Sequence, residues 1–246
     1  MKFAIISDIH GNLVALEAVL AELKADAPVQ IVCLGDVSVT GPQPRQSLAK
    51  VRELGCPVVM GNTDEWILAP TPFTIRSEDD QILYDLERWA AEQMTEADLA
   101  FIRTFQPTIE LDLGDGRTLL CCHGSPRNNR EIIRATTPDE ELAEILGEHR
   151  VAIIAGGHTH TPMLRRLGNS FILNSGSVGL PMWREDGVVK NPAWAEYALV
   201  EVANGRLNIA LRRAPYPLDD LRAAIQNSVM PHAVRFLADW IPGGGA

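Results

Sequence analysis

Short apolar runs rich in β-branched residues recur along the 246-residue chain and alternate with amphipathic segments. The runs cover residues 3–6, 31–34, 58–60, 119–122, 151–155 and 171–173. Apolar runs of this length are typical of buried strands. Between the first two, Leu13, Leu16, Leu20 and Leu23 are spaced three or four residues apart behind Asn12, which predicts a helix with Asn12 as its N-cap. This alternation predicts an α/β fold.

Other segments carry equally local signals. Thr137 is expected to cap a helix, with Pro138 in its first turn and Glu140 completing a capping box. Asn204-Gly205 separates two alternating segments and predicts a hairpin of residues 197–202 and 207–211. Further helices are expected over residues 46–54, 82–94, 95–105 and 217–228. We expect one domain over residues 1–246, with a frayed tail at 243–246.

The composition limits the compartment and the partners. Apolar residues make up 46% of the chain, yet no apolar run approaches the ~20 residues that span a bilayer. Asp8 follows too early for a signal peptide, so a cytoplasmic protein is expected. The four cysteines lack CxxC spacing and are expected to be reduced and buried. The net charge of −10 disfavours a stable nucleic acid complex or binding to anionic membranes, and leaves homo-oligomerisation open.

Five of the predicted strands end in the same kind of polar loop. Each is succeeded by glycine-flanked residues of the types that bind metals: Asp8 and His10, Asp36, Asn62, His123, and His158 with His160. In open α/β sheets, ligands bind beyond the carboxyl ends of the strands. Imidazole, carboxylate and amide ligands without thiolate suit Mn, Fe, Ni, Co or Zn. Seven ligands are too many for one ion, so we expect two divalent ions, with Asp36 between them.

These blocks resemble the signature of the calcineurin-like metallophosphoesterase superfamily, which reads D-x-H, G-D, G-N-x-D, a single His and G-H-x-H. The matches are Asp8-Ile9-His10, Gly35-Asp36, Gly61-Asn62-Thr63-Asp64, His123 and Gly157-His158-Thr159-His160. Residues 41–44 and 174–181 are similar to flanking motifs of its small prokaryotic phosphodiesterase branch.

The resemblance implies a four-layer α-β-β-α sandwich of two mixed sheets flanked by helices, with a dimetal site at the carboxyl ends of the strands. It assigns one metal to Asp8, His10 and His160 and the other to Asn62, His123 and His158, and it makes Asp36 the bridge. Manganese is the favoured metal. Asp36, Asn62, His123 and Asp64 are expected to serve catalysis, which would proceed by attack of a hydroxide held between the ions.

Thr63 departs from the family pattern. Many members carry at this position a histidine that is thought to protonate the leaving group, and threonine cannot replace it. This favours phosphodiesters with good leaving groups over alkyl monoesters. In the family, this aspartate partly orients that histidine. Here Asp64 is expected either to hold Asn62 or to have a structural role.

Two residues are candidates for binding substrate. Arg127 is expected either to bind a phosphate oxygen or to pair with Glu131. Asn12 is expected to be an N-cap, a substrate ligand, or both.

The sequence therefore predicts a two-metal phosphodiesterase acting on small or nucleotide-like phosphate esters. Two alternatives within the same chemistry are a phosphomonoesterase or protein phosphatase, and a dinucleoside polyphosphate hydrolase. An alternative of another class is a non-catalytic protein-binding scaffold, like the retromer subunit that resembles these enzymes. The complete set of seven ligand positions disfavours the scaffold.

Overall fold

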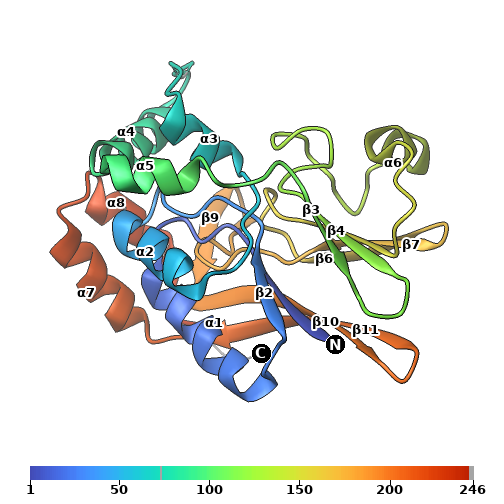
Figure 1. The fold of residues 1–246 in the computed structure, drawn as a ribbon. Coiled ribbons are helices and arrows are strands. Elements are labelled where there is room, and N and C mark those ends of the chain that lie inside the picture. Colours follow the sequence, from blue (N-terminus) through green and yellow to red (C-terminus); the bar gives the residue numbers. More distant parts are fainter. Residues whose placement is uncertain (73, 244–246) are drawn as a thin grey trace.

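The computed structural model describes residues 1–72 and 74–243 and contains two main mixed β-sheets flanked by helices (Figure 1). The predicted fold class is therefore confirmed. Of the expected tail at 243–246, residues 244–246 lie outside the described residues. Within the described ranges, no helix has the length and apolar character needed to cross a membrane.

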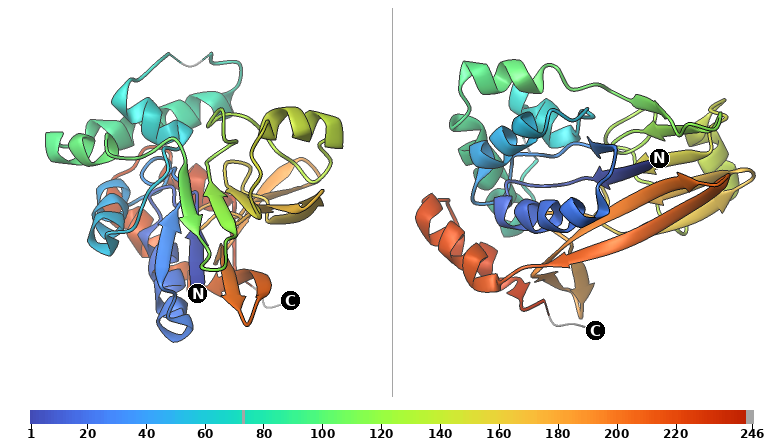
Figure 2. Two further views of the ribbon diagram at one scale, coloured as in Figure 1. Left: turned by 45° about the vertical axis from the view of Figure 1, so that its right-hand side comes forward. Right: turned by 60° about the horizontal axis from the view of Figure 1, so that its bottom comes forward.

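The first sheet has the strand order β11-β10-β1-β2. Strands β1 and β2 are parallel, whereas β10 is antiparallel to both β1 and β11. The predicted hairpin turns at Asn204-Gly205, and its two ten-residue strands lie at the front of Figure 2, right. Their bounds are Lys2–Ile6 (β1), Gln30–Cys33 (β2), Trp194–Ala203 (β10) and Arg206–Pro215 (β11).

The second sheet has the order β3-β4-β5-β7-β6. Its three inner strands are parallel and correspond to predicted apolar runs. The two edge strands are antiparallel to their neighbours and expose alternate residues, which is why their sequences carry no continuous apolar run. The bounds are Ile109–Asp112 (β3), Thr118–Cys121 (β4), Ile153–Gly156 (β5), Met163–Leu167 (β6) and Ser170–Asn174 (β7).

Three layers of buried apolar side chains separate four layers of secondary structure. Along β1, Ala4 and Ile6 face the helices packed on the first sheet, while Phe3 and Ile5 face the second sheet. Side chains alternate along a strand, so each strand contributes to two layers. Cys121 likewise lies between the sheets, and Cys122 lies with the helix on the far side. The two adjacent thiols therefore lie in separate layers.

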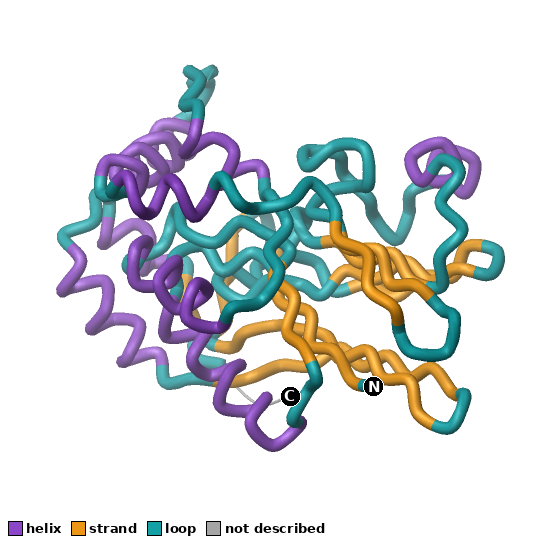
Figure 3. The backbone as a smooth tube through the Cα atoms, viewed as in Figure 1, coloured by secondary structure: helices purple, strands orange, loops and turns teal. Residues whose placement is uncertain are grey.

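Most helices lie on the left in Figure 1, against the first sheet, while α6 covers the second sheet. Figure 3 shows the loops gathered between the helical half and the strands. The helices are Leu13–Asp26 (α1), Pro44–Leu54 (α2), Asn62–Leu68 (α3), Glu78–Glu92 (α4), Glu96–Ile102 (α5), Asp139–Leu146 (α6), Leu218–Ser228 (α7) and Ala233–Ala238 (α8).

A small sheet of order β12-β9-β8 was not predicted. Its strands are Trp183–Glu185 (β8), Val188–Pro192 (β9) and Trp240–Ile241 (β12). The ring of Trp183 stacks on that of Trp194, with their centroids 6.0 Å apart and 17° between their planes. The hairpin of β8 and β9 thus packs Trp183 against the first residue of β10.

Two local predictions were wrong. Residues 58–60 form no strand, because Val58 and Val59 make only isolated bridges, to Cys33 and Gln106, before the chain turns into α3. Thr137 does not cap α6. The N-cap is Pro138, which has no side-chain donor or acceptor, and the Thr137 hydroxyl instead accepts a hydrogen bond from the Arg134 amide.

Candidate metal centre

The loops after the parallel strands of both sheets converge on one site. The loop after β1 carries Asp8 and His10, and the loop after β2 carries Asp36. Asn62 is the first residue of α3, His123 follows β4, and His158 and His160 follow β5. The carboxyl ends of parallel strands meet at one edge of a sheet, which is where α/β proteins bind ligands. The fold therefore brings all seven residues to one place.

Asp8, His10 and His160 form the first cluster of possible metal ligands, with their ligand atoms within 4.8 Å of one another. The Nε2 atoms of His10 and His160 lie 3.0 Å apart, and His160 Nε2 lies 3.2 Å from Asp8 Oδ1. All three side chains are buried. Two ring nitrogens and a carboxylate oxygen thus converge on one point.

Asp36, His123 and His158 form the second cluster. His123 Nε2 lies 3.4 Å from Asp36 Oδ2 and 3.0 Å from Asn62 Oδ1, so the amide joins this group. Asp36 Oδ2 also lies 3.8 Å from His10 Nε2 of the first cluster. Asp36 therefore stands between the two clusters, the position expected of a shared ligand.

Hydrogen bonds at the far ring nitrogens fix the tautomers of two histidines. His123 Nδ1 donates to the Leu34 carbonyl at 2.8 Å, and His160 Nδ1 donates to the Leu180 carbonyl at 2.9 Å. A ring that carries its proton on Nδ1 presents a lone pair at Nε2, as metal-binding histidines do. Both Nε2 atoms point into the clusters.

One buried carboxylate oxygen shows that a cation fits here. Asp8 Oδ1 is fully buried and accepts no hydrogen bond, whereas Asp8 Oδ2 accepts one from the His158 amide. His160, His10 and His123 bring their Nε2 atoms to within 3.2, 3.8 and 4.0 Å of Asp8 Oδ1. A buried anionic oxygen without a donor is costly, and a divalent cation would satisfy it together with the nitrogens.

The backbone at these positions is unusual. Asp8, His10, Asp36, His158 and His160 all have φ between +47° and +65°. Residues with side chains adopt this region rarely and at a cost, and such strain concentrates at functional sites. Hydrogen bonds between the loops hold it, including His10 N to the Asp36 carbonyl at 2.9 Å and Asp8 N to the Gly35 carbonyl at 3.0 Å.

Two glycines allow the loops to approach one another. A Cβ on Gly61 would collide with the Asp36 carboxylate, and one on Gly157 would collide with Ser7 Oγ and Asp8 Oδ2. Any other residue at these positions would displace a candidate ligand.

The charges in the two clusters are strongly linked. Burial opposes ionisation of Asp36 and Asp8, but the protonated histidines around them outweigh it and lower the pKa of both carboxyls. Burial also opposes protonation of His123, yet the Asp36 charge raises the pKa of this histidine to about 10. Burial and the charge of His123 lower the pKa of His158. Without cations, protons would compensate the two carboxylates.

Asp64 holds the loop that carries Asp36. Its Oδ2 accepts hydrogen bonds from the amides of Asp36 at 2.7 Å and Gly61 at 3.1 Å, and its Oδ1 accepts one from Val37 at 3.0 Å. The side chain is fully buried. Burial and the Asp36 charge raise its pKa to about 6. Asp64 is therefore placed to position the backbone of Asp36 and not to hold Asn62.

The two candidate substrate residues belong to neither cluster. Arg127 forms an ion pair with Glu131 and donates to the Glu144 carbonyl. Asn12 caps α1 by accepting from the Ala15 amide at 3.1 Å, and its Nδ2 donates to the Gly179 carbonyl. Both side chains are thus used within the protein.

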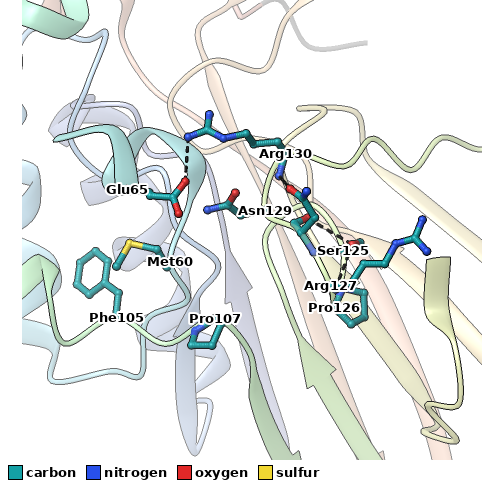
Figure 4. A pocket seen from close by; sticks show the side chains of 10 residues that line it. Met60, Glu65, Phe105, Pro107, Ser125, Pro126, Arg127, Asn129 and Arg130 are labelled. Carbon is teal, nitrogen blue, oxygen red and sulfur yellow. Dashed lines mark hydrogen bonds and ion pairs between the residues drawn. The ribbon is translucent and has the colours of Figure 1, made fainter. Parts of the chain in front are cut away.

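Arg130, rather than Arg127, approaches a candidate ligand, and its sequence position gave no sign of this. Its guanidinium donates to Glu65 at 2.9 Å and reaches the Asn62 carbonyl at 3.4 Å. Figure 4 shows Arg130 extending toward Glu65, while Arg127 extends to the opposite side. Among the described residues, none lines both the cavity in Figure 4 and the cavity over the clusters.

The cavity over the clusters has a volume of about 360 Å³ and is also lined by Thr63 and Glu87. Glu87 lies on α4 and is only 5% exposed. Burial, followed by the Asp36 charge, raises its pKa to about 8. One acidic residue on an amphipathic helix carries no sequence signal, so Glu87 was not among the candidates.

Comparison with known proteins agrees with this geometry. Residues 1–205 match the family model described as a calcineurin-like phosphoesterase superfamily domain. The chain belongs to this superfamily. The enzyme class expected from the sequence, a metal-dependent phosphoester hydrolase, is thereby confirmed, and the superfamily implies divalent metal ions, for which the two clusters are the candidate ligands.

Three similar proteins match nearly the whole chain. A metallophosphoesterase from Sphaerobacter thermophilus is 28% identical and has a TM-score of 0.72, with 97% of this chain and 98% of that chain covered. The hypothetical protein PH1004 from Pyrococcus horikoshii is 20% identical, with a TM-score of 0.77 and coverage of 100% and 99%. The uncharacterized protein MJ0912 from Methanocaldococcus jannaschii is 26% identical over 93% of each chain.

Proposed function

We propose that this phosphoesterase is a phosphodiesterase that hydrolyses small phosphate diesters with two manganese ions. The main support for diesters as substrates comes from Thr63. This residue lines the cavity beside the candidate ligands. Its Oγ1 is buried without a hydrogen-bond partner, and its amide donates to Asp36 Oδ1 at 2.9 Å. A hydroxyl of ordinary acidity is a poor proton donor to a leaving group.

Histidine elsewhere does not replace the missing acid. Four of the six histidines belong to the two clusters. Of the others, His232 pairs with Asp85 at 2.9 Å, and neither it nor His149 lines the cavity. Substrates whose leaving group departs without protonation therefore suit the site best, and aryl phosphodiesters are the simplest of these.

Each residue that would surround the substrate phosphate has its own role. Asp8, His10 and His160 would hold one ion, Asn62, His123 and His158 the other, and Asp36 both. The bound pair would supply an activated water and positive charge for the phosphate oxygens. Asp64 fixes the backbone of Asp36, and Arg130 adds a guanidinium beside Asn62.

The donor set and the charge of the chain support the remaining choices. The clusters offer carboxylate, amide and imidazole without thiolate, and a site with this share of oxygen ligands suits manganese. The net charge of −10 disfavours a long polyanion, so a small ester is the proposed substrate. A cytoplasmic setting fits the four free thiols.

The test is turnover by protein stripped with a chelator and reloaded with Mn²⁺, Ni²⁺, Mg²⁺ or Zn²⁺. We expect bis-p-nitrophenyl phosphate to be hydrolysed at least tenfold more efficiently than methyl phosphate, whose alkoxide leaving group needs a proton, with Mn²⁺ the best activator and two ions per chain. Asp36→Ala should abolish turnover, whereas Asp220→Ala, at an exposed position of α7, should not. Equal efficiency on both esters would contradict the proposal.

A further inference from the structure

The cavity over the clusters has a polar floor and an apolar wall. The floor is formed by Thr63 and five of the candidate ligands, which are His10, Asp36, Asn62, His158 and His160. The wall consists of Ile82, Leu83 and Leu86 from α4, Met182 and Val189 at the β8–β9 hairpin, and Phe236 from α8. These elements lie outside the metal-ligand motifs, and α4, α8 and β9 lie on the same side of the molecule (Figure 1). One cavity thus combines a polar floor suited to phosphate with an apolar wall suited to an organic group.

Part of this wall is open to solvent. Leu83 is 40% exposed and Met182 is 43% exposed, although the chain as a whole is acidic. Exposed apolar side chains that share a cavity with a catalytic centre are typical of a ligand site. At about 360 Å³, the cavity lies near the lower end of the range for such sites, which favours a small organic group.

Two arginines in the described ranges line the cavity, and one of them is already paired with carboxylates. Arg235 pairs with Asp239 at 2.6 Å and with Asp79 at 3.4 Å, and Arg184 donates to the Gly187 carbonyl. Among the described residues that line the cavity, Arg184 is then the one arginine without a carboxylate partner, so at most one fixed positive charge is left for a second phosphate. Asp79, Glu87 and Asp239 line the same cavity and oppose a polyanionic group there. The charges therefore fit a diester monoanion better than a polyphosphate.

A nucleoside is also poorly matched. Base recognition commonly uses an accessible aromatic ring. Trp183 stacks on Trp194 and does not line the cavity, and the ring of Phe236 packs against Trp240 with a centroid distance of 6.0 Å.

We propose that the wall formed by α4, the β8–β9 hairpin and α8 binds the organic group of the substrate, and that this group is a short alkyl chain or a single aromatic ring. The inference rests on the proposed function, because the clusters fix where the phosphate lies. It names the substrate class as apolar phosphodiesters and sets nucleotide esters aside.

The first experiment holds the leaving group constant. Manganese-loaded protein is given p-nitrophenyl methyl phosphate, p-nitrophenyl hexyl phosphate and thymidine 5′-p-nitrophenyl phosphate. Each buried methylene strengthens binding, so we expect kcat/KM for the hexyl ester to exceed that for the methyl ester by about tenfold or more, mainly through KM. Equal values for these two esters, or a preference for the thymidine ester, would overturn the inference.

Two matched variants locate the effect. Leu83→Asp places a charge in the wall, while Leu211→Asp places one on β11 outside the cavity, and both leucines are 40% exposed. We expect Leu83→Asp to reduce the preference for hexyl over methyl at least fivefold and Leu211→Asp to leave it unchanged. A preference that survives Leu83→Asp would place the organic group elsewhere.

A binding measurement separates this inference from the proposed function. If none of the three esters is turned over, the proposed function fails. Calorimetric titration of the loaded protein with methylphosphonate and hexylphosphonate then tests the wall alone. Binding of hexylphosphonate at least tenfold tighter would support the apolar wall, and equal or undetectable binding of both would overturn it.

Discussion

Asp64 Oδ2 accepts a hydrogen bond from the amide of Asp36 at 2.7 Å, so one buried carboxylate sets the backbone position of another. The same oxygen accepts from Gly61, and the other oxygen accepts from Val37. Asp36 stands between the two clusters of candidate ligands. The Asp64 side chain therefore controls the geometry of the centre without belonging to either cluster.

Replacing Asp64 by asparagine should disturb that geometry. The amide NH₂ would face a backbone N–H in place of an acceptor, which costs about 1–3 kcal/mol of unfolding free energy. We expect a matching loss in urea unfolding at pH 8, above the pKa of about 6, together with fewer bound ions and at least tenfold lower kcat.

Asp98 provides the control, because it occupies the same helical position in α5 and accepts from the Thr95 amide at 3.0 Å. Asp98→Asn should lower stability while leaving metal content and kcat unchanged. If both variants lose activity alike, Asp64 has no special positioning role.

Removing the ions should lower thermal stability. An ion present at a hundred times its Kd stabilises the folded state by about 2.7 kcal/mol, which for a chain of this size corresponds to roughly 5–10 °C in Tm. Scanning calorimetry with and without chelator measures this shift. Asp36→Ala should show little response to chelator. An unchanged Tm after the wild-type ions are lost would argue against ligation by these buried side chains.

Metal loading should release protons. The pKa of His123 is raised to about 10, so this ring is protonated at pH 7.5 without metal, and it must lose the proton to become a ligand. We expect at least one proton released per chain, measured by calorimetry in buffers of different ionisation enthalpy. His123→Asn should release fewer protons, and His149→Asn, outside the site, should match the wild type.

The raised pKa of His123 also determines how the stability of the metal-free protein changes with pH. The histidine pKa is higher in the folded state, so its stabilisation is complete below about pH 6.5 and is lost as the pH rises toward 10. The difference in Tm between loaded and metal-free protein should therefore widen over this window. A constant difference would contradict the assignment.

Glu87 should make the metal-free protein less stable at high pH. Its pKa rises from 4.5 to about 8 on folding, because burial disfavours the charged form. Stability is therefore lost as the pH rises through this window. Glu87→Gln removes the penalty, and we expect it to be about 2–5 kcal/mol more stable than the wild type at pH 9 and equal to it at pH 4.

The control for this variant is Glu92→Gln, at an exposed position of the same helix. It should track the wild type at every pH. A Glu87→Gln protein whose urea midpoint differs from the wild type by the same amount at both pH values would show that the effect is packing and not ionisation.

The two arginines near the site should differ in kinetics. Arg127 is held by Glu131, so Arg127→Ala should leave KM for a diester within about twofold. Arg130 is likewise paired with Glu65, but it also reaches the backbone carbonyl of the candidate ligand Asn62, so Arg130→Ala should shift Asn62 and raise KM several-fold. Steady-state kinetics on bis-p-nitrophenyl phosphate compares the two. The reverse order would restore Arg127 as the substrate residue.

The sequence predicted those elements whose signal is local. Strands buried on both faces, such as β1 and β4, have continuous apolar runs, and the polar residues after them marked the clusters. The edge strands β3 and β6 alternate with charged residues and resemble loops in the sequence. Residues 58–60 have the composition of a strand but too few partners to form one.

The apolar wall could not be predicted, because it is built from three separate parts of the chain, at residues 82–86, 182–189 and 236. Nothing in the Leu83 segment indicates that Met182 and Phe236 lie across a cavity from it. For Arg127, the local spacing indicated the correct partner, since Glu131 lies four residues later and forms an ion pair with it. Arg130 lies beside Asn62 only because the fold brings α3 next to it, which no local sequence signal indicates.

The left-handed backbone of five candidate ligands has a consequence for protein engineering. Copying the seven side chains onto another scaffold with ordinary extended loops would aim the carboxylates and imidazoles in different directions. A transplanted centre would need the backbone of the turns as well, together with Gly61, Gly157 and the Asp64 carboxylate that hold them in register. The centre can therefore be transferred only as a set of loops with their backbone conformation, and not as seven side chains alone.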